Sequence, residues 1–244
     1  MKKKQISGTA LKYFAIIAMT VDHIALLFFS AGTIPYYIMR LFGRFTAPIM
    51  TYLLVEGYRH TRDRKVYFKR LVLFAGIAQP IYFLFEFGRL PKNALEFLTN
   101  WNVLYTLAVA LVVLVLFDSQ RLSSAPSLIL LGVLIGLSHF GDWSYLIPAW
   151  AIIFYCYQSD RCKMMILYCI ASVTLQTLIF AKQFDSFAAF SFQYGTLFAL
   201  IPISMYSGKR GGEKHLQLNH WFFYIYYPAH MIVLLVIRAM IGKL

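Results

Sequence analysis

The sequence contains few charged residues. Only 14% of its 244 residues are Asp, Glu, Lys or Arg, whereas 60% are hydrophobic, and the mean hydropathy is +0.64. A water-soluble domain carries about a quarter of its residues as charges and spreads them over its surface. This composition excludes a water-soluble fold and predicts an integral membrane protein made almost entirely of membrane spans.

Acidic residues and cysteines are scarce. The chain has 23 lysines and arginines but 10 aspartates and glutamates, a net charge of +13 that would suit nucleic acid in a soluble protein. Here the basic residues gather between apolar runs, as the positive-inside rule predicts, so we expect no nucleic-acid partner. Cys156, Cys162 and Cys169 have no paired Cys-x-x-Cys spacing and predict neither a disulfide framework nor a metal site.

Long apolar runs account for most of the chain. Each has about 15 to 23 residues, close to the length that crosses a hydrocarbon core of about 30 Å. The predicted fold class is an all-α polytopic membrane protein, a bundle of about nine helices forming one transmembrane domain, 1–244, with no soluble domain. The predicted spans are 11–31, 35–57, 66–86, 101–117, 125–139, 143–158, 163–181, 189–206 and 219–240.

Two of these segments, 125–139 and 143–158, are short for a full crossing. They form either two tilted spans or a re-entrant hairpin that neighbouring helices bury. With nine crossings, sixteen basic residues at or beyond the span ends lie on the side of the N-terminus and five lie on the other side. This excess predicts a cytoplasmic N-terminus and an external C-terminus.

Charged residues lie inside the first two predicted spans. A charge costs about 2.5 to 3.5 kcal/mol near the centre of a span, so the charges that remain there are usually paired and often functional. Asp22 and His23 lie about 15 Å from the inner edge, close to the midplane. Arg40 and Arg44 share one helix face and reach the same depth from the outer edge. We expect an antiparallel helix pair to bring these side chains together.

The last span contributes a second histidine at this depth. His230 lies about 16 Å from the inner end of its span, and Pro228 is expected to kink the helix beside it. One interpretation is an ion pair of Asp22 with Arg44 that only neutralises itself. The other is a polar site formed by Asp22, His23, Arg40, Arg44 and His230, with Tyr226 nearby.

Weaker polar positions lie at span ends. Glu56 is either a boundary residue whose side chain reaches the surface or a contact for a cytosolic ligand. Asn102 begins the fourth span, and Asp142 lies at the apex of the short pair. The sequence contains no HExxH or GxSxG motif, and we expect no metal.

Several short motifs, in this order and spacing, resemble the TraX family over nearly the whole chain. They are Asp22-His23-Ile24, Arg40-Leu41-Phe42-Gly43-Arg44, Glu56-Gly57, Asn102-Val103-Leu104-Tyr105, Gly141-Asp142-Trp143-Ser144 and Phe223-Tyr224-Ile225-Tyr226-Tyr227-Pro228-Ala229-His230. The family is named for the conjugal-transfer protein associated with N-terminal acetylation of pilin, and it is similar to polytopic acyltransferases of the acyltransferase-3 kind. The sequence departs from the family pattern at Asp142-Trp143-Ser144, where an aromatic residue followed by glycine is expected.

The resemblance implies an acetyltransferase of the bacterial inner membrane that uses cytosolic acetyl-CoA. Its acceptor is an amine or a hydroxyl, on a pilin-like peptide N-terminus or a surface glycan. Acetyl transfer needs a base for the acceptor and a positive group for the oxyanion. We assign the base to His23, electrostatic tuning to Asp22, oxyanion stabilisation to Arg40 or Arg44, and a second base or positioning donor to His230.

The basic segment after the second span suits the phosphates of CoA, although topology alone also explains its charge. The candidate cofactor-binding residues are Glu56, Arg59, Arg62, Lys69 and Arg70. A rival hypothesis is a proton-coupled membrane transporter in which Asp22, His23 and His230 relay protons. The nine segments show no internal repeat, which argues against a transporter. A third hypothesis is a structural assembly partner.

Overall fold

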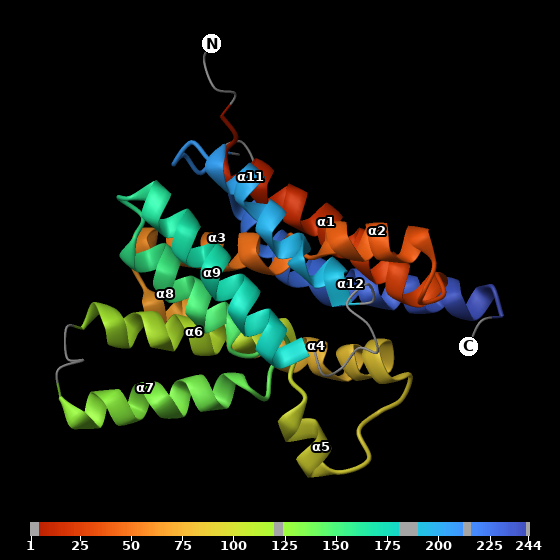
Figure 1. The fold of residues 1–244 in the computed structure, drawn as a ribbon. Helices are drawn as coiled ribbons and strands as arrows, with labels where there is room; N and C mark the ends of the chain where they lie inside the picture. The colour runs from red at the N-terminus through yellow and green to blue at the C-terminus, as the bar shows by residue number, and fades with distance from the viewer. Residues whose placement is uncertain (1–4, 120–123, 181–189, 212–215, 243–244) are drawn as a thin grey trace. The chain divides into compact units, whose positions relative to one another are not determined.

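The structure is a computed structural model that describes residues 5–119, 124–180, 190–211 and 216–242. Within these ranges the regular structure is helical and no sheet is present. The helices in chain order are α1 (Gly8–Phe28), α2 (Ile34–Gly43), α3 (Thr46–His60), α4 (Arg64–Phe87), α5 (Ala94–Thr99), α6 (Val103–Asp118), α7 (Ala125–Ser138), α8 (Leu146–Cys156), α9 (Arg161–Phe180), the 3₁₀ helix η3 (Ser191–Ala199), α11 (Leu200–Ser204) and α12 (Leu216–Met240) (Figure 1).

In the described residues, five helical segments are long and apolar enough to cross a membrane. They are α1, α2 together with α3, α4, α9 and α12. Helices α6, α7 and α8 are apolar but have only 16, 14 and 11 residues. Fourteen residues of α-helix span about 21 Å, less than a hydrocarbon core of about 30 Å. The chain is therefore an all-α membrane protein, whereas nine crossings stay a prediction.

The chain divides into two compact units. Unit 1 contains Met1–Leu53 and Ser172–Leu244, and unit 2 contains Leu54–Ala171. Helices α3 and α9 each contribute residues to both units. A single domain of residues 1–244 stays a prediction.

Unit 1 is built around the antiparallel pair of α1 and α2. The five residues that join these helices are too few for anything but a reversal of direction, and α12 packs against α1. Gly43 lies against Asp22 so closely that a Cβ atom at position 43 would lie 2.2 Å from the Asp22 Cβ. Only glycine allows this approach, which brings the two helices together at the predicted polar level.

The predicted span 35–57 is interrupted within unit 1. Helix α2 ends at Gly43, and Arg44 and Phe45 form a turn before α3 begins at Thr46. Pro48 has no N–H to donate to the carbonyl of Arg44, and its ring crowds that carbonyl, so a continuous helix is disfavoured there. The break leaves Arg44 at the C-terminal end of α2, where a cation interacts favourably with the helix dipole.

The segment predicted as the span 189–206 also differs from a regular α-helix. Its described part is the nine-residue 3₁₀ helix η3 followed by the five-residue helix α11. Runs of 3₁₀ helix longer than about four residues are uncommon. Helix η3 packs against α2, beside the interruption.

Unit 2 contains α4, α5, α6, α7 and α8 as whole helices, and α6 and α7 lie side by side (Figure 1). Asn102 accepts a hydrogen bond from the backbone N–H of Leu104 and so caps α6. Its amide donates to the carbonyl of Ala75 at 2.8 Å and to Gln79 Oε1 at 2.6 Å, both on α4. Asn102 is buried and holds the start of α6 against α4.

Backbone contacts join segments that the predicted topology puts on one face of the membrane. In unit 1 the N–H of Ile6 donates to the carbonyl of Met205 at 2.9 Å, and both residues lie at predicted inner ends. In unit 2 the N–H of Asp142 donates to the carbonyl of Trp101 at 2.8 Å, and both lie at predicted outer ends. Each contact agrees with the predicted topology within its own unit.

The turn at the predicted apex contains two non-glycine residues with positive φ, Trp143 (63°) and Ser144 (40°). This conformation costs about 1–3 kcal/mol per residue, and glycine adopts it without that cost. We expect Ser144→Gly to stabilise the protein by about 1 kcal/mol, because the greater backbone freedom of unfolded glycine offsets part of the gain. Denaturant unfolding in detergent measures the change. Ser172→Gly, inside α9, should instead destabilise by about 0.5–1 kcal/mol, and a loss of stability in both variants would contradict the interpretation.

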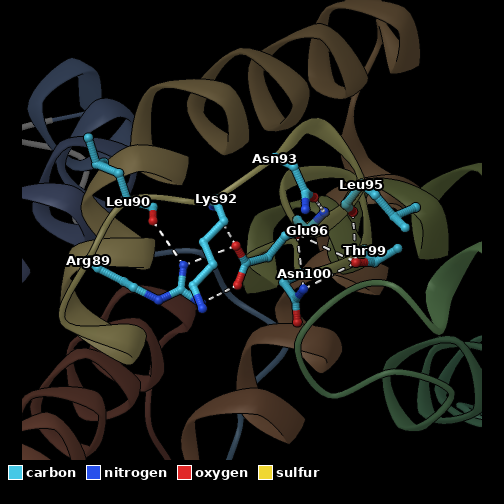
Figure 2. A network of polar contacts seen from close by, with 8 residues as sticks. All are labelled: Arg89, Leu90, Lys92, Asn93, Leu95, Glu96, Thr99 and Asn100. Atoms are coloured by element: carbon cyan, nitrogen blue, oxygen red, sulfur yellow. Dashed lines mark hydrogen bonds and ion pairs between the residues drawn. The ribbon is translucent and has the colours of Figure 1, made fainter.

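The loop between α4 and α6 contains a partly exposed ion pair (Figure 2). Arg89 Nη1 lies 3.0 Å from Glu96 Oε2, and the backbone N–H of Lys92 donates to the same carboxylate at 2.6 Å. Hydrogen bonds from Arg89 and from Lys92 lower the pKa of Glu96 from 4.5 to about 2. The pair therefore stabilises the folded loop above about pH 4.5, and this stabilisation is lost as the pH falls towards 2.

We expect the protection of the Lys92 amide against hydrogen exchange to fall between pH 4.5 and about 2. Protection factors corrected for intrinsic exchange measure this loss. Glu96→Gln removes the titrating group and should show low protection with no change over that range. A pH-independent difference between the two proteins would contradict the assignment.

Candidate functional site

Three charged side chains meet between α1 and α2 in unit 1. Arg40 Nη1 lies 2.7 Å from Asp22 Oδ2, and Arg44 Nη2 lies 2.7 and 2.8 Å from the two carboxylate oxygens. Asp22 is 7% exposed and Arg44 is 8% exposed. The carboxylate therefore holds both guanidiniums at one point inside the apolar part of the unit.

Helix η3 covers the guanidiniums from another direction. The ring of Phe192 lies 5.4 Å from the guanidinium of Arg40 and 5.6 Å from that of Arg44, within cation–π range. Arg44 Nη1 also donates to Gln193 Oε1 at 3.3 Å. Sequence reasoning missed Phe192 and Gln193, because an uncharged residue in an apolar segment gives no signal of its contacts.

His23 and His230 form a hydrogen-bonded pair between α1 and α12. His23 Nδ1 lies 2.7 Å from His230 Nε2, and His230 Nδ1 lies 2.9 Å from the carbonyl oxygen of Tyr226. The two rings are nearly coplanar, with an interplanar angle of 5°. The structure thus brings together the two histidines that the sequence places at one depth.

The hydrogen bonds fix the tautomers of neutral rings. A carbonyl oxygen only accepts, so His230 Nδ1 donates to Tyr226 and His230 Nε2 is left as an acceptor. His23 Nδ1 must then donate to His230. The basic lone pair of His23 is consequently on Nε2, which is the nitrogen that can take a proton.

Thr20 and Tyr226 support the histidine pair. The Thr20 hydroxyl donates to the carbonyl of Ile16 at 2.9 Å, which leaves the Tyr226 hydroxyl to donate to Thr20 Oγ1 at 2.7 Å. The ring of Tyr226 stacks on His230 with centroids 5.1 Å apart. Tyr226 therefore holds His230 through both its ring and its carbonyl. The sequence analysis did not select Thr20, because a lone threonine in a span is not an unusual residue.

The five residues assigned to CoA lie in unit 2, whereas the histidines and the three charges lie in unit 1. Glu56 accepts from the Gln158 amide, and Arg59 donates to the Tyr155 carbonyl. The guanidinium of Arg70 lies 5.7 Å from the ring of Tyr67. Arg62 and Lys69 are exposed.

An acidic residue that the sequence did not single out organises this end of unit 2. Asp118, at the end of α6, accepts from the Tyr58 hydroxyl at 2.9 Å, from the Tyr155 hydroxyl, and from Arg64 Nη1 at 2.7 Å. The guanidinium of Arg64 also lies 4.1 Å from the centroid of the Tyr58 ring. These contacts tie α3, α4, α6 and α8 together, so part of the basic segment has a structural role.

The remaining predicted polar residues, Asn102 and Asp142, belong to unit 2. Asn102 is the cap of α6 described above, and Asp142 Oδ1 accepts from the backbone N–H of Trp143 at 2.9 Å within the apex turn. Across the described ranges, no group of three or more His, Cys, Asp or Glu side chains is arranged to hold a metal ion.

Comparisons with known proteins cover both units. The family model for TraX protein matches residues 7–238. A probable fimbrial assembly protein FimC, serogroup H1, of Dichelobacter nodosus is 35% identical over an alignment of 234 residues, and the alignment covers 93% of this chain and 94% of that protein. No solved structure matches the chain. The matched region contains the Asp22 cluster and both paired histidines, and the chain belongs to the TraX family.

Proposed function

We propose that the protein is an acetyltransferase of the bacterial inner membrane, related to acyltransferase-3 enzymes, that moves an acetyl group from cytosolic acetyl-CoA to an amine or hydroxyl. The observation that carries the proposal is the His23–His230 pair in the same unit as a carboxylate that holds two guanidiniums. Membership of the TraX family and the similarity to a fimbrial assembly protein suggest a pilin-related function. They favour a pilin-like peptide N-terminus over a surface glycan as the acceptor.

His23 is the base in this proposal. Its Nε2 removes a proton from the acceptor as the acceptor nitrogen or oxygen attacks the thioester carbonyl. The new bond to the acetyl carbon forms, the carbon–sulfur bond breaks, and the proton passes to the departing CoA thiolate. His230 stabilises the transient His23 imidazolium by accepting the hydrogen bond from its Nδ1.

The guanidiniums stabilise the oxyanion that develops on the thioester carbonyl. Donors that are already oriented before the reaction need no reorganisation as charge develops, which is the main advantage of such a site. Asp22 provides this orientation, because it contacts Arg40 and Arg44 at 2.7 Å each. Asp22 therefore acts by positioning the arginines in addition to tuning the field at His23.

Acetyl-CoA is the donor substrate, and its phosphates need cationic contacts at the cytosolic surface. Arg59 is engaged with Tyr155, and Glu56 with Gln158. Of the five residues assigned from the sequence, the exposed Arg62 and Lys69 fit this role best.

Release of the CoA thiol by the purified protein in liposomes tests the proposal. An acetyltransferase should consume acetyl-CoA when an apolar peptide with a free N-terminal amine is present, and mass spectrometry should show an acetyl group on that amine. His139→Ala serves as a control, because His139 stacks on Tyr145 in unit 2 and takes no part in the proposed reaction. Absence of thiol release and of acetylated peptide would overturn the proposal.

The hydrogen-bonded pair of His23 and His230 also supports a second candidate, the proton-coupled transporter. A transporter would move protons across liposome membranes without releasing thiol. Simultaneous measurement of internal pH and free thiol in one preparation distinguishes the two functions.

We expect the identity of residue 230 to control the tautomer of His23. His230→Gln keeps an acceptor for His23 Nδ1 and should retain most activity, whereas His230→Leu removes it and should lower the rate about 10- to 100-fold. Nitrogen NMR of labelled histidine should show the Nδ1–H form of His23 in the wild type and His230→Gln but a mixture of tautomers in His230→Leu. Full activity in His230→Leu would contradict this role.

A further inference from the structure

The loop between α4 and α6 carries a small apolar surface. Leu90, Leu95 and Leu98 are 56%, 71% and 55% exposed. Leu95 and Leu98 are three residues apart on α5 and therefore share one face of this short helix. Leu90, which precedes α5 in the chain, is a third exposed leucine of the same loop.

Aromatic contacts hold α5 at the level of the last turns of α4. The ring of Phe97 stacks on Phe83, with centroids 6.2 Å apart and an interplanar angle of 6°, and it contacts Trp101 at 5.2 Å. Phe83 lies only about 6 Å before the end of α4, a candidate membrane span. The leucines of α5 therefore lie near the boundary between the hydrocarbon core and the lipid headgroups.

The polar groups of the loop satisfy one another (Figure 2). The N–H of Glu96 donates to Asn93 Oδ1 at 2.8 Å, and Asn100 Nδ2 donates to the carbonyl of Glu96 at 2.9 Å. The Thr99 hydroxyl donates to the carbonyl of Leu95 at 2.8 Å, and Arg89 pairs with the Glu96 carboxylate. A segment that enters the membrane interface needs such internal partners, because lipid offers few hydrogen bonds to the backbone.

The charges of the loop fit lipid headgroups. Lys92 is exposed, and the side chain of Arg89 remains 39% exposed beside Glu96. Cations next to an apolar surface at this depth complement the phosphate groups of lipids while the leucines enter the acyl region. In contact with water, these large leucine side chains would be less favourable in free energy than in contact with acyl chains.

We infer that residues 88–102 form an interfacial segment of the protein, in which Leu90, Leu95 and Leu98 contact acyl chains while Arg89 and Lys92 contact lipid phosphates. The inference rests on the loop alone and holds whether or not the protein transfers acetyl groups. It assigns the exposed leucines to the lipid bilayer and not to a protein partner.

Spin labels at Leu95→Cys and Leu98→Cys test the inference in liposomes of phosphatidylethanolamine and phosphatidylglycerol. The background is the chain with Cys156→Ser, Cys162→Ser and Cys169→Ala. Collision rates with oxygen and with a water-soluble nickel chelate measure depth. Leu73→Cys, at an exposed position on α4, is the reference within the membrane, and Lys65→Cys, at an exposed position at the start of α4, is the aqueous reference.

We expect the oxygen-to-nickel ratio at positions 95 and 98 to be several-fold higher than at 65 and lower than at 73, because residue 73 lies near the middle of the span. A ratio equal to that at 65 would overturn the inference. Labels shielded from both reagents would also overturn it, because they would show a protein segment covering the leucines. The wild-type chain gives a second measurement, since a phospholipid with a photoreactive acyl chain should label residues 89–100, and absence of label there with labelling of α7 would again overturn it.

Discussion

His23→Ala is expected to abolish acetyl transfer while leaving acetyl-CoA affinity and folding nearly intact. The proposed base acts on the transition state, so its removal should lower the rate by about 10²–10⁴. It should contribute little to donor affinity, because the phosphates of acetyl-CoA are proposed to bind at the cytosolic surface. Turnover of acetyl-CoA by the purified variant in liposomes, together with its equilibrium binding of CoA, separates the two effects.

The histidine pair provides the comparison for this variant. His230→Ala should cost less than His23→Ala, because His230 orients the base and does not itself remove the proton in this mechanism. Wild-type turnover in His23→Ala would transfer the role of base to His230. Loss of activity in both variants, with an acetylated histidine trapped on either, would instead indicate a covalent two-step route.

Asp22→Asn should destabilise the protein strongly. Removing one partner from a buried ion pair costs about 3–5 kcal/mol, because the remaining charge is left in a poorly solvating environment. Arg44→Gln should cost less, since Arg40 still pairs with Asp22 at 2.7 Å. The sum of the stability losses in the two single variants should exceed the loss in the double variant by about 0.5–3 kcal/mol. Denaturant unfolding in mild detergent provides the three free energies.

Arg64 and Asp118 form a matched control for this cycle. Their side chains are also 2.7 Å apart, but they are 44% and 33% exposed. Solvent screens such a pair, so the coupling between Arg64→Gln and Asp118→Asn should be below about 1 kcal/mol. Additive losses for Asp22 and Arg44 would show that their contact does not stabilise the site.

The contact of Asp22 with Arg40 and Arg44 could be predicted because it depends on helix geometry and on the length of one connection. The helix rise sets the depth of each residue, and the short connection forces α1 and α2 to run antiparallel. The helix rise also placed His23 and His230 at one depth. It did not determine that the two side chains form a hydrogen bond, because packing against α1 sets the rotation of α12 about its own axis.

Other features depended on contacts between distant segments. Residues 191–199 form a 3₁₀ helix that packs on α2 and places Gln193 against Arg44. No periodic pattern in the sequence indicates this conformation. The tie from Tyr58 to Asp118 joins residues 60 positions apart. The interruption of the second span did have a local signal, because Pro48 has no N–H to continue the helix.

Asp22, Arg40 and Arg44 belong to consecutive helices, so the ribosome makes them one after another. A lone α2 entering the bilayer would carry two unpaired cations, and a lone α1 would carry an unpaired anion, at about 2.5–3.5 kcal/mol for each charge near the centre. When α1 and α2 insert as a hairpin, the carboxylate offsets one of the two guanidinium charges and pairs with both side chains before any later helix has been synthesised. The contacts that hold the site in the mature protein therefore also lower the barrier to its insertion, and variants of Asp22 should accumulate as poorly inserted chains before any effect on folding is seen.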